Sequence, residues 1–256
     1  MSGLSLISSH PRFSEIVELT DLQNLHLLAP DLRCLSPEAC AELNTRRLAL
    51  LCQPYVEELA VLTLEVAQLL SRCTPQGRSS VYAHCEQTVV AAQHLLALRE
   101  GRGGPGPAWL PGWFNQVPVL TKEEVDTLLS YVRHHDYGKP FVFNQDEKGV
   151  VHFPGHPLSS ARVAAQLGLS PEIQTLILHD STLHTVALPE LERALCEYPS
   201  KLLPLQFYAA LASVWANSLD FGGEASTSFK IKLKHLSRAY RRVGGAQPAS
   251  EFWKKE

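Results

Sequence analysis

The sequence lacks paired cysteines. It has six cysteines in 256 residues, and no two of them form a C-x-x-C pair. A disulfide framework or a cysteine-ligated zinc site needs closer and better matched spacing. We therefore expect reduced thiols and a cytoplasmic protein. The six are Cys34, Cys40, Cys52, Cys73, Cys85 and Cys196.

Long apolar runs and a strong net charge are also missing. No stretch approaches the roughly 18 apolar residues that span a bilayer, and the first residues, MSGLSLISSHPRF, lack the basic and apolar regions of a secretory signal. The net charge of -3 gives no general attraction to nucleic acids. We expect no membrane partner, and the oligomeric state is left open.

The composition is that of a globular helical protein. Hydrophobic residues make up 45% of the chain and charged residues 19%, which allows a sizeable core. Strand-like alternation is scarce, whereas apolar residues recur at helical spacing. We predict an all-α helical bundle, with an N-terminal helical extension over residues 1–77, a main domain over 78–225 and a basic C-terminal tail over 226–256.

Several helix boundaries can be read from local signals. A helix is expected from Ser79 to Arg99, and Thr121 with Glu124 matches a capping box at the start of another. That second helix should end near Gly138 and Pro140. Further helices are expected at 156–168, 170–180 and 205–220. A turn at 146–149, flanked by apolar residues, permits one short β-hairpin.

A loop rich in glycine and proline is expected at residues 101–118. It carries Trp109, Trp113 and Phe114, which can pack onto the domain or form a lid over a site. Packing is the favoured interpretation, because large aromatic side chains usually seek burial.

Histidine and aspartate recur along the predicted helices in a way that suggests a metal site. A single histidine on an apolar helix face is usually a hydrogen-bonded core residue, but Asp136 and Asp220 also fall on inward faces. A buried, unpaired carboxylate costs several kcal/mol, and a metal ion removes that cost. The predicted ligands are His84, His135, Asp136, His156, His179 and Asp220. Such ligands suit one or two divalent ions among Mn, Fe, Co, Ni and Mg.

These motifs resemble the HD-domain superfamily of metal-dependent phosphohydrolases over about residues 78–225. The resemblance rests on His84, on His135-Asp136 followed by Tyr137-Gly138-Lys139, and on Asp220. The segment Phe153-Pro154-Gly155-His156, with Ser160-Ala161 after it, is similar to the second-metal region of the two-metal branches. The segment Ile177-Leu178-His179-Asp180, with His184 after it, is similar to the HD domain of bacterial tRNA nucleotidyltransferases and to dinucleoside-tetraphosphate hydrolases.

The resemblance implies an HD-domain fold and a role for each residue. One ion would be held by His84, His135, Asp136 and Asp220, and a second by His156 and His179, with Asp136 bridging. Lys139 would contact a phosphate, although it also suits a helix C-terminus. Asp180 would orient a ligand or act as a general base, and His184 would protonate a leaving group; a surface or supporting role is the alternative for both.

The expected activity is hydrolysis of a phosphomonoester or phosphodiester of a nucleotide or related small phosphate through a metal-activated water. Two other functions are kept open. One is a diiron oxygenase of the inositol-oxygenase type, which this chain resembles in having the same set of six ligands. The other is a non-catalytic, metal-stabilised binding module. The basic residues between Phe229 and Arg242 can also attract RNA or another polyanion, although a solvated helix face is the usual explanation and the favoured one.

Overall fold

The computed structural model describes residues 70, 73, 79–185, 191 and 198–244. These residues are almost all helical or connecting, which confirms the predicted all-α class. The predicted N-terminal extension, apart from Leu70 and Cys73, and the last 12 residues lie outside the described residues. The chain divides into two compact units, residues 1–83 with 134–174 and residues 84–133 with 175–256, and each is described by itself.

The first unit contains a short hairpin and the helix that follows it. Strands β1 (Asn144–Gln145) and β2 (Val151–His152) pair antiparallel, as the turn at 146–149 had allowed. Asp146 closes the turn by accepting hydrogen bonds from the backbone N–H groups of Lys148 and Val150, both at 2.9 Å. Helix α8 (His156–Gln166) packs against the 3-10 turn η4 (Lys139–Phe141).

Helix α7 (Lys122–His134) starts where the capping box predicted and ends earlier than expected. The backbone N–H of Thr121 donates to Glu124 Oε2 at 2.7 Å, and the N–H of Glu124 donates to Thr121 Oγ1 at 3.3 Å. The predicted end near Gly138 was four residues too late. Residues 135–141 form tight turns with i to i-3 hydrogen bonds, since Pro140 disfavours helical backbone just before it.

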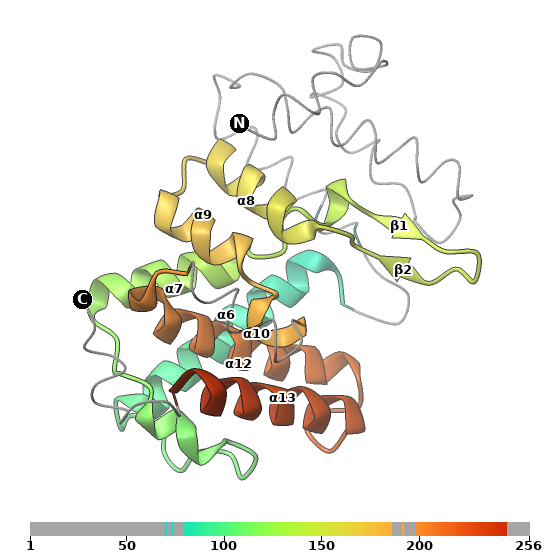
Figure 1. Ribbon diagram of the computed structural model, residues 1–256. Helices are drawn as coiled ribbons and strands as arrows, with labels where there is room; N and C mark the ends of the chain where they lie inside the picture. Colours follow the sequence, from blue (N-terminus) through green and yellow to red (C-terminus); the bar gives the residue numbers. More distant parts are fainter. Residues whose placement is uncertain (1–69, 71–72, 74–78, 186–190, 192–197, 245–256) are drawn as a thin grey trace. The chain divides into compact units, whose positions relative to one another are not determined.

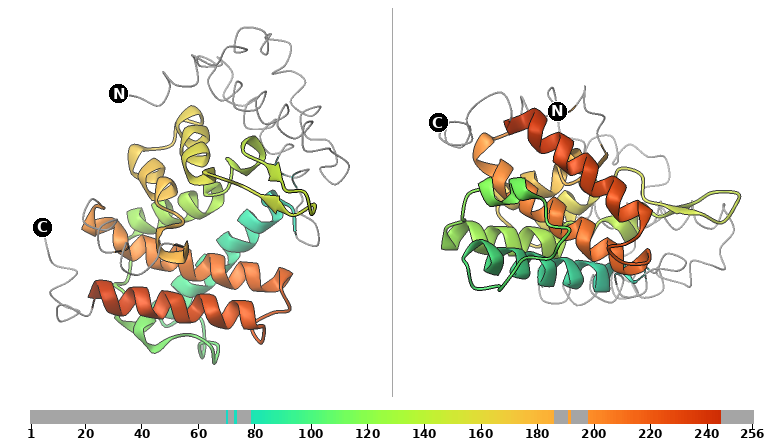
Figure 2. Two further views of the ribbon diagram at one scale, coloured as in Figure 1. Left: turned by 45° about the vertical axis from the view of Figure 1, so that its right-hand side comes forward. Right: turned by 90° about the horizontal axis from the view of Figure 1, so that it is seen from below.

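The second unit is built around helix α12 (Leu203–Asp220), which is buried along most of its length. Helix α13 (Thr227–Gly244) lies beside α12 in all the views of Figures 1 and 2. The short helix α10 (Thr182–Thr185) contacts both of these helices. The 3-10 turn η5 (Ser200–Leu202) leads into α12. Helices α6 (Val81–Arg99) and α9 (Pro171–Leu178) match two further predictions, and each begins in one unit and ends in the other.

The aromatic residues of the 101–118 loop pack into the second unit rather than forming a lid. Phe114, in the 3-10 turn η3 (Gly112–Gln116), is fully buried. Trp113 stacks on Tyr240 with ring centroids 4.7 Å apart, and Trp109 meets Phe229 edge to face at 5.2 Å. The aromatic side chains of this loop therefore pack against α13 and hold it in place.

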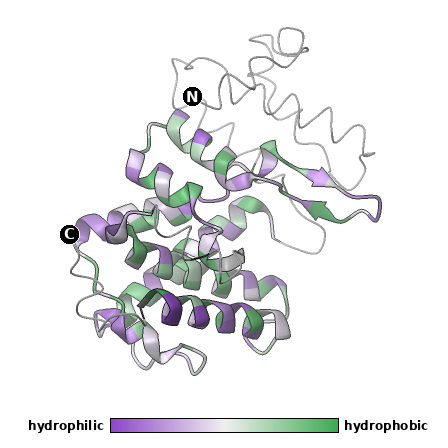
Figure 3. Ribbon diagram, viewed as in Figure 1, coloured by the Kyte–Doolittle hydropathy of each residue, from purple (hydrophilic) through white to green (hydrophobic). Residues whose placement is uncertain are grey.

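Helix α13 is amphipathic, as its coloured ribbon shows in Figure 3. One side buries Phe229, Leu236, Ala239 and Tyr240, while the lysines and arginines lie mostly on the exposed side. The part of the predicted basic tail that is described is thus a folded helix of the second unit. None of the described helices is long and apolar enough to cross a membrane.

Candidate metal centre

Asp136 is the centre of the candidate site. It lies in the turn directly after α7, and its side chain is only 2% exposed. His135 Nε2 lies 3.4 Å from its Oδ2 atom, and the Lys139 ammonium forms an ion pair with the same oxygen. His156 Nε2 lies 3.5 Å from the other oxygen, Oδ1. One buried carboxylate in the first unit is therefore surrounded by three nitrogen groups.

The hydrogen bonding of His156 fixes which ring nitrogen faces Asp136. Its Nδ1 atom lies 3.1 Å from the carbonyl oxygen of Phe153. A carbonyl only accepts, so Nδ1 must carry the proton, and in the neutral ring Nε2 then presents a lone pair toward Asp136 Oδ1. A backbone carbonyl that receives the second ring N–H is the usual support of a metal-binding histidine.

His84, His135 and Asp136 form a buried group that can hold a metal ion. Each offers one ligand atom, and these atoms lie within 4.8 Å of one another. Among the residues the structure describes, it is the one such group of three or more histidine, cysteine or acidic side chains. Two imidazoles and one carboxylate suit first-row transition metals, whereas cysteine is absent from the set.

Gly138 lets the turn after Asp136 lie against α8. Its backbone N–H donates to Ser160 Oγ at 2.9 Å. A Cβ atom at this position would lie 2.1 Å from the backbone nitrogen of Ser160 and 2.4 Å from the carbonyl carbon of Ser159. Only glycine fits such a contact, and it brings the Asp136 turn onto the same helix that begins with His156.

The other predicted ligands are not part of the three-residue group. His179 is half-buried and packs edge to face against Tyr198, with ring centroids 5.0 Å apart. Asp220 is only half-buried, because it is the last residue of α12, whereas a buried carboxylate had been expected. His184 lies in α10, and its side chain is outside the described part of the chain. The roles predicted for these three residues stay predictions.

Asp180 belongs to a separate buried network in the second unit. The Tyr131 hydroxyl lies 2.6 Å from Asp180 Oδ1 and 3.1 Å from Gln206 Oε1. The Gln206 amide N–H donates to the Leu176 carbonyl at 2.8 Å, which directs its oxygen toward the phenol. Burial, and secondly the nearby Asp180, raise the pKa of Tyr131 well above its usual value. This network links α7, α12 and the turn after α9.

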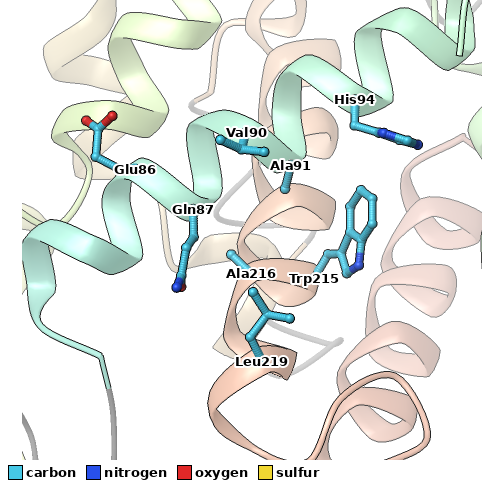
Figure 4. Close-up of a pocket in the computed structure, with 8 residues that line it drawn as sticks. All are labelled: Glu86, Gln87, Val90, Ala91, His94, Trp215, Ala216 and Leu219. Carbon is cyan, nitrogen blue, oxygen red and sulfur yellow. The ribbon is translucent and has the colours of Figure 1, made fainter.

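A groove of about 370 Å³ in the second unit is lined mainly by apolar atoms of α6 and α12. Figure 4 shows Trp215 beside His94, and their ring centroids are 5.2 Å apart. Glu86, at one end, forms an ion pair with Arg133 at 3.1 Å. The groove lacks a cluster of metal-ligating side chains among its described residues. The candidate metal site is therefore the group around Asp136.

Three contacts in and around the site were not anticipated from the sequence. Tyr131 falls on the buried stripe of α7, so its position was readable, but its pairing with Asp180 and Gln206 was not. The Phe153 carbonyl is a backbone group, which carries no signal in the sequence.

Comparisons with family models, with curated proteins and with solved structures gave no match to this chain. The functional interpretation therefore depends on the residues described above.

Proposed function

We propose that this chain is a metal-dependent phosphohydrolase that cleaves a phosphomonoester or phosphodiester of a nucleotide or related small phosphate. The observation that carries the proposal is the environment of Asp136. It is a buried carboxylate with imidazole nitrogens near both oxygens, and the Phe153 carbonyl orients the His156 ring so that Nε2 faces Oδ1. In a neutral His156 ring this Nε2 atom carries a lone pair 3.5 Å from the carboxylate oxygen, an arrangement that a cation bound by both atoms would stabilise.

The residues present fit a divalent transition metal. His84, His135 and Asp136 would hold one ion, and His156 would join them or help to hold a second ion with Asp136 bridging. Metal–ligand distances of about 2.0–2.2 Å place ligand atoms roughly 3–4 Å apart, and the ligand atoms of this group all lie within 4.8 Å of one another. His179 and Asp220 complete the six ligands that we propose. The number of bound ions, one or two, depends on whether these two residues join the other ligands.

When bound, such an ion lowers the pKa of a coordinated water and neutralises phosphate oxygens. The protein's own contribution is to hold the ligands in place and to supply positive charge. Asp136 is almost fully buried, and the water-excluding surroundings strengthen its electrostatic interactions. Asp180 as an orienting residue or base, and His184 as a proton donor, remain part of the proposal.

Lys139 favours a phosphate substrate over the oxygenase alternative. Its ammonium lies at the Asp136 carboxylate and 5.4 Å from the centre of the Phe153 ring, and its side chain is 22% exposed. An ammonium at the edge of a metal centre can exchange its carboxylate partner for a phosphate oxygen without leaving the site. A neutral polyol would offer no anionic oxygen for this exchange.

The test is hydrolysis of a phosphoester panel by protein loaded with Mn, Fe, Co, Ni or Mg. The panel contains nucleoside monophosphates, cyclic nucleotides, dinucleoside polyphosphates and p-nitrophenyl esters. Metal content is measured by mass spectrometry on the same samples, which also gives the number of ions per chain. We expect metal-dependent release of phosphate or nucleotide, and loss of this release in Lys139→Ala with the metal retained.

The two alternatives make different predictions in the same assay. Metal-loaded protein that hydrolyses nothing, but consumes oxygen with a polyol and Fe, would replace the hydrolase with the diiron oxygenase. Protein that needs metal to stay folded and shows neither activity would be a binding module. Protein that takes up no divalent ion at all would contradict all three functions.

A further inference from the structure

Helix α13 carries an unusually one-sided charge. It contains six lysines and arginines and no aspartate or glutamate, although the chain as a whole has a net charge of -3. At 100° per residue, five of the six cations fall within one arc of about 120°. The five are Lys230, Lys234, Arg238, Arg241 and Arg242, and all are exposed.

The cations form a row along the helix axis. Lys230, Lys234 and Arg238 are four residues apart, which corresponds to a rise of about 6 Å at each step. From Lys230 to Arg242 the row is about 18 Å long. One nucleic-acid strand carries a phosphate about every 3.4 Å of axis, so the row spans about five phosphates.

The row is held on a rigid base. On its opposite side, Tyr240 stacks on Trp113 and donates its hydroxyl hydrogen to Gln116 Oε1 at 3.2 Å. Trp113 Nε1 donates to Ser237 Oγ at 3.0 Å, and Phe229 packs against Trp109. Because the helix is already fastened, binding a partner would cost little ordering of the backbone.

Four of the five cations in the row, Lys230, Lys234, Arg238 and Arg241, have donors available for a partner. Lys230, Lys234 and Arg238 form no ion pair with any described residue. Arg241 uses one N–H to reach the Ser237 carbonyl at 3.2 Å, which leaves the rest of its guanidinium. A solvated face needs no such segregation of charge, and acidic neighbours would normally be interspersed.

We propose that this face, Lys230, Lys234, Arg238, Arg241 and Arg242 of α13, binds the sugar–phosphate backbone of a nucleic acid without sequence preference. The row contains no exposed aromatic, asparagine or glutamine side chain that would read or stack on a base. Binding would therefore depend on phosphate contacts and on salt. This surface is separate in its residues from the proposed metal centre, and its test does not depend on hydrolysis.

A membrane or an acidic protein fits this face less well. The apolar side of α13 is occupied by the core, and Ile231 is the single large apolar residue exposed on the described helix. Insertion into a lipid interface needs a free apolar face. Stable protein interfaces usually centre on aromatic or aliphatic anchors, which the row does not contain.

The experiment measures binding of fluorescein-labelled 20-nucleotide RNA and DNA strands by fluorescence anisotropy at about 25 to 300 mM salt. The protein concentrations cover the range of roughly 10⁻⁴–10⁻⁶ M that is typical of the Kd of nonspecific binding. The face variant combines Lys230→Ala, Lys234→Ala, Arg238→Ala and Arg241→Ala. The control variant removes four exposed cations elsewhere, by Arg102→Ala, Lys122→Ala, Lys148→Ala and Lys201→Ala. Both variants change the net charge equally.

We expect the parent protein to bind at low salt with a log–log salt slope of about -3.5 to -4.5, at roughly 0.7–0.9 for each of about five phosphate contacts. The face variant should bind at least 10-fold more weakly and lose most of that slope, while the control variant keeps both. Binding to RNA alone would identify RNA as the class of nucleic acid that binds. Binding to both strands would support the sugar–phosphate backbone as the target. If circular dichroism shows that the face variant has lost helix, the Lys234→Ala, Arg238→Ala double variant should lose about half the slope.

Three outcomes would overturn the proposal. The first is no binding to either strand at 25 mM salt. The second is equal loss of binding in the face and control variants, which would indicate a diffuse charge effect. The third is binding to vesicles of phosphatidylcholine and phosphatidylserine with none to nucleic acid, which would assign the face to an anionic lipid surface.

Discussion

The chain contains two His-Asp dipeptides whose aspartates are both buried but have different surroundings. Asp136 follows His135 and is met by imidazoles and by the Lys139 ammonium. Asp180 follows His179, but its described partner is the neutral hydroxyl of Tyr131 at 2.6 Å. The first arrangement concentrates nitrogen ligands and positive charge on one carboxylate. The second resembles a structural hydrogen-bond network that ties helices together.

The difference shows that the dipeptide itself carries little functional information. Both pairs lie at the end of a helix, and both aspartates are less than 10% exposed. What separates them is which side chains from elsewhere in the chain reach the carboxylate. Asp136 receives His156 from α8, whereas Asp180 receives a phenol from α7. The two aspartates should therefore respond differently to the same substitution.

The largest effect is expected from Asp136→Asn. The amide keeps the shape but loses the charge that pairs with Lys139 and that would hold the proposed metal ion. We expect loss of bound metal and a fall in phosphoester hydrolysis by about 10²–10⁴-fold. Metal content and initial rates would be measured on protein whose circular dichroism matches the parent.

The matched control is Asp180→Asn, because the amide oxygen still accepts the Tyr131 hydrogen bond. It should keep its metal and most of its activity, with only a modest loss of stability. If Asp180→Asn instead abolishes turnover while metal and stability are retained, Asp180 acts in the reaction as the family resemblance implies, and the contrast between the two aspartates disappears.

The next effect concerns the packing that brings Asp136 onto α8. Gly138→Ala would place a Cβ atom 2.1 Å from the Ser160 backbone nitrogen, and backbone cannot yield as a flexible side chain can. We expect a destabilisation of about 1–3 kcal/mol from overpacking, measured by urea unfolding, together with weaker metal binding.

Gly112→Ala serves as the control for this substitution. A Cβ atom there meets nothing within 4 Å, so the change in stability should stay within about 0.5 kcal/mol. Equal stability of the two alanine variants would contradict the close approach of Gly138 and Ser160.

Removal of the Tyr131 hydroxyl should destabilise the protein without touching the metal. Tyr131→Phe removes the one hydroxyl hydrogen that the Asp180 and Gln206 oxygens share, and the loss of this buried donor costs about 1–3 kcal/mol. Tyr240→Phe is the comparison, because its acceptor Gln116 is exposed and water can replace the hydroxyl. Loss of metal in Tyr131→Phe at unchanged stability would show that this network serves the metal centre.

The sequence was sufficient for features that depend on neighbouring residues. The capping box at Thr121 placed the start of α7, and the helical spacing in 205–220 placed α12 within two residues. Two other features were not predicted. The end of α7 at His134 follows from the tight turns before Pro140, and the Tyr131–Asp180 contact joins residues 49 apart. His135 and Asp136 were predicted to face inward, and both are buried. The contact between Asp136 and His156 follows from folding of the intervening hairpin and α8.

The smallest effect is expected from alkaline pH. Burial raises the pKa of Tyr131 well above its usual value and raises the pKa of Tyr208 to about 12. A raised folded-state pKa means that stability is complete below the unfolded value of about 10 and declines as pH rises beyond it. Each such tyrosine contributes a slope of up to about 1.4 kcal/mol per pH unit in that range.

Tyr131→Phe should therefore reduce the alkaline loss of stability between pH 10 and 12, relative to its own stability at pH 8. Urea unfolding at each pH gives the slopes of the parent and of this variant. An identical slope in the parent and in Tyr131→Phe would mean that this phenol ionises as readily in the folded chain as in the unfolded one. The hydroxyl between Asp180 and Gln206 would then be open to water. Asp180 would no longer differ from Asp136 in having a buried, neutral phenol as its partner.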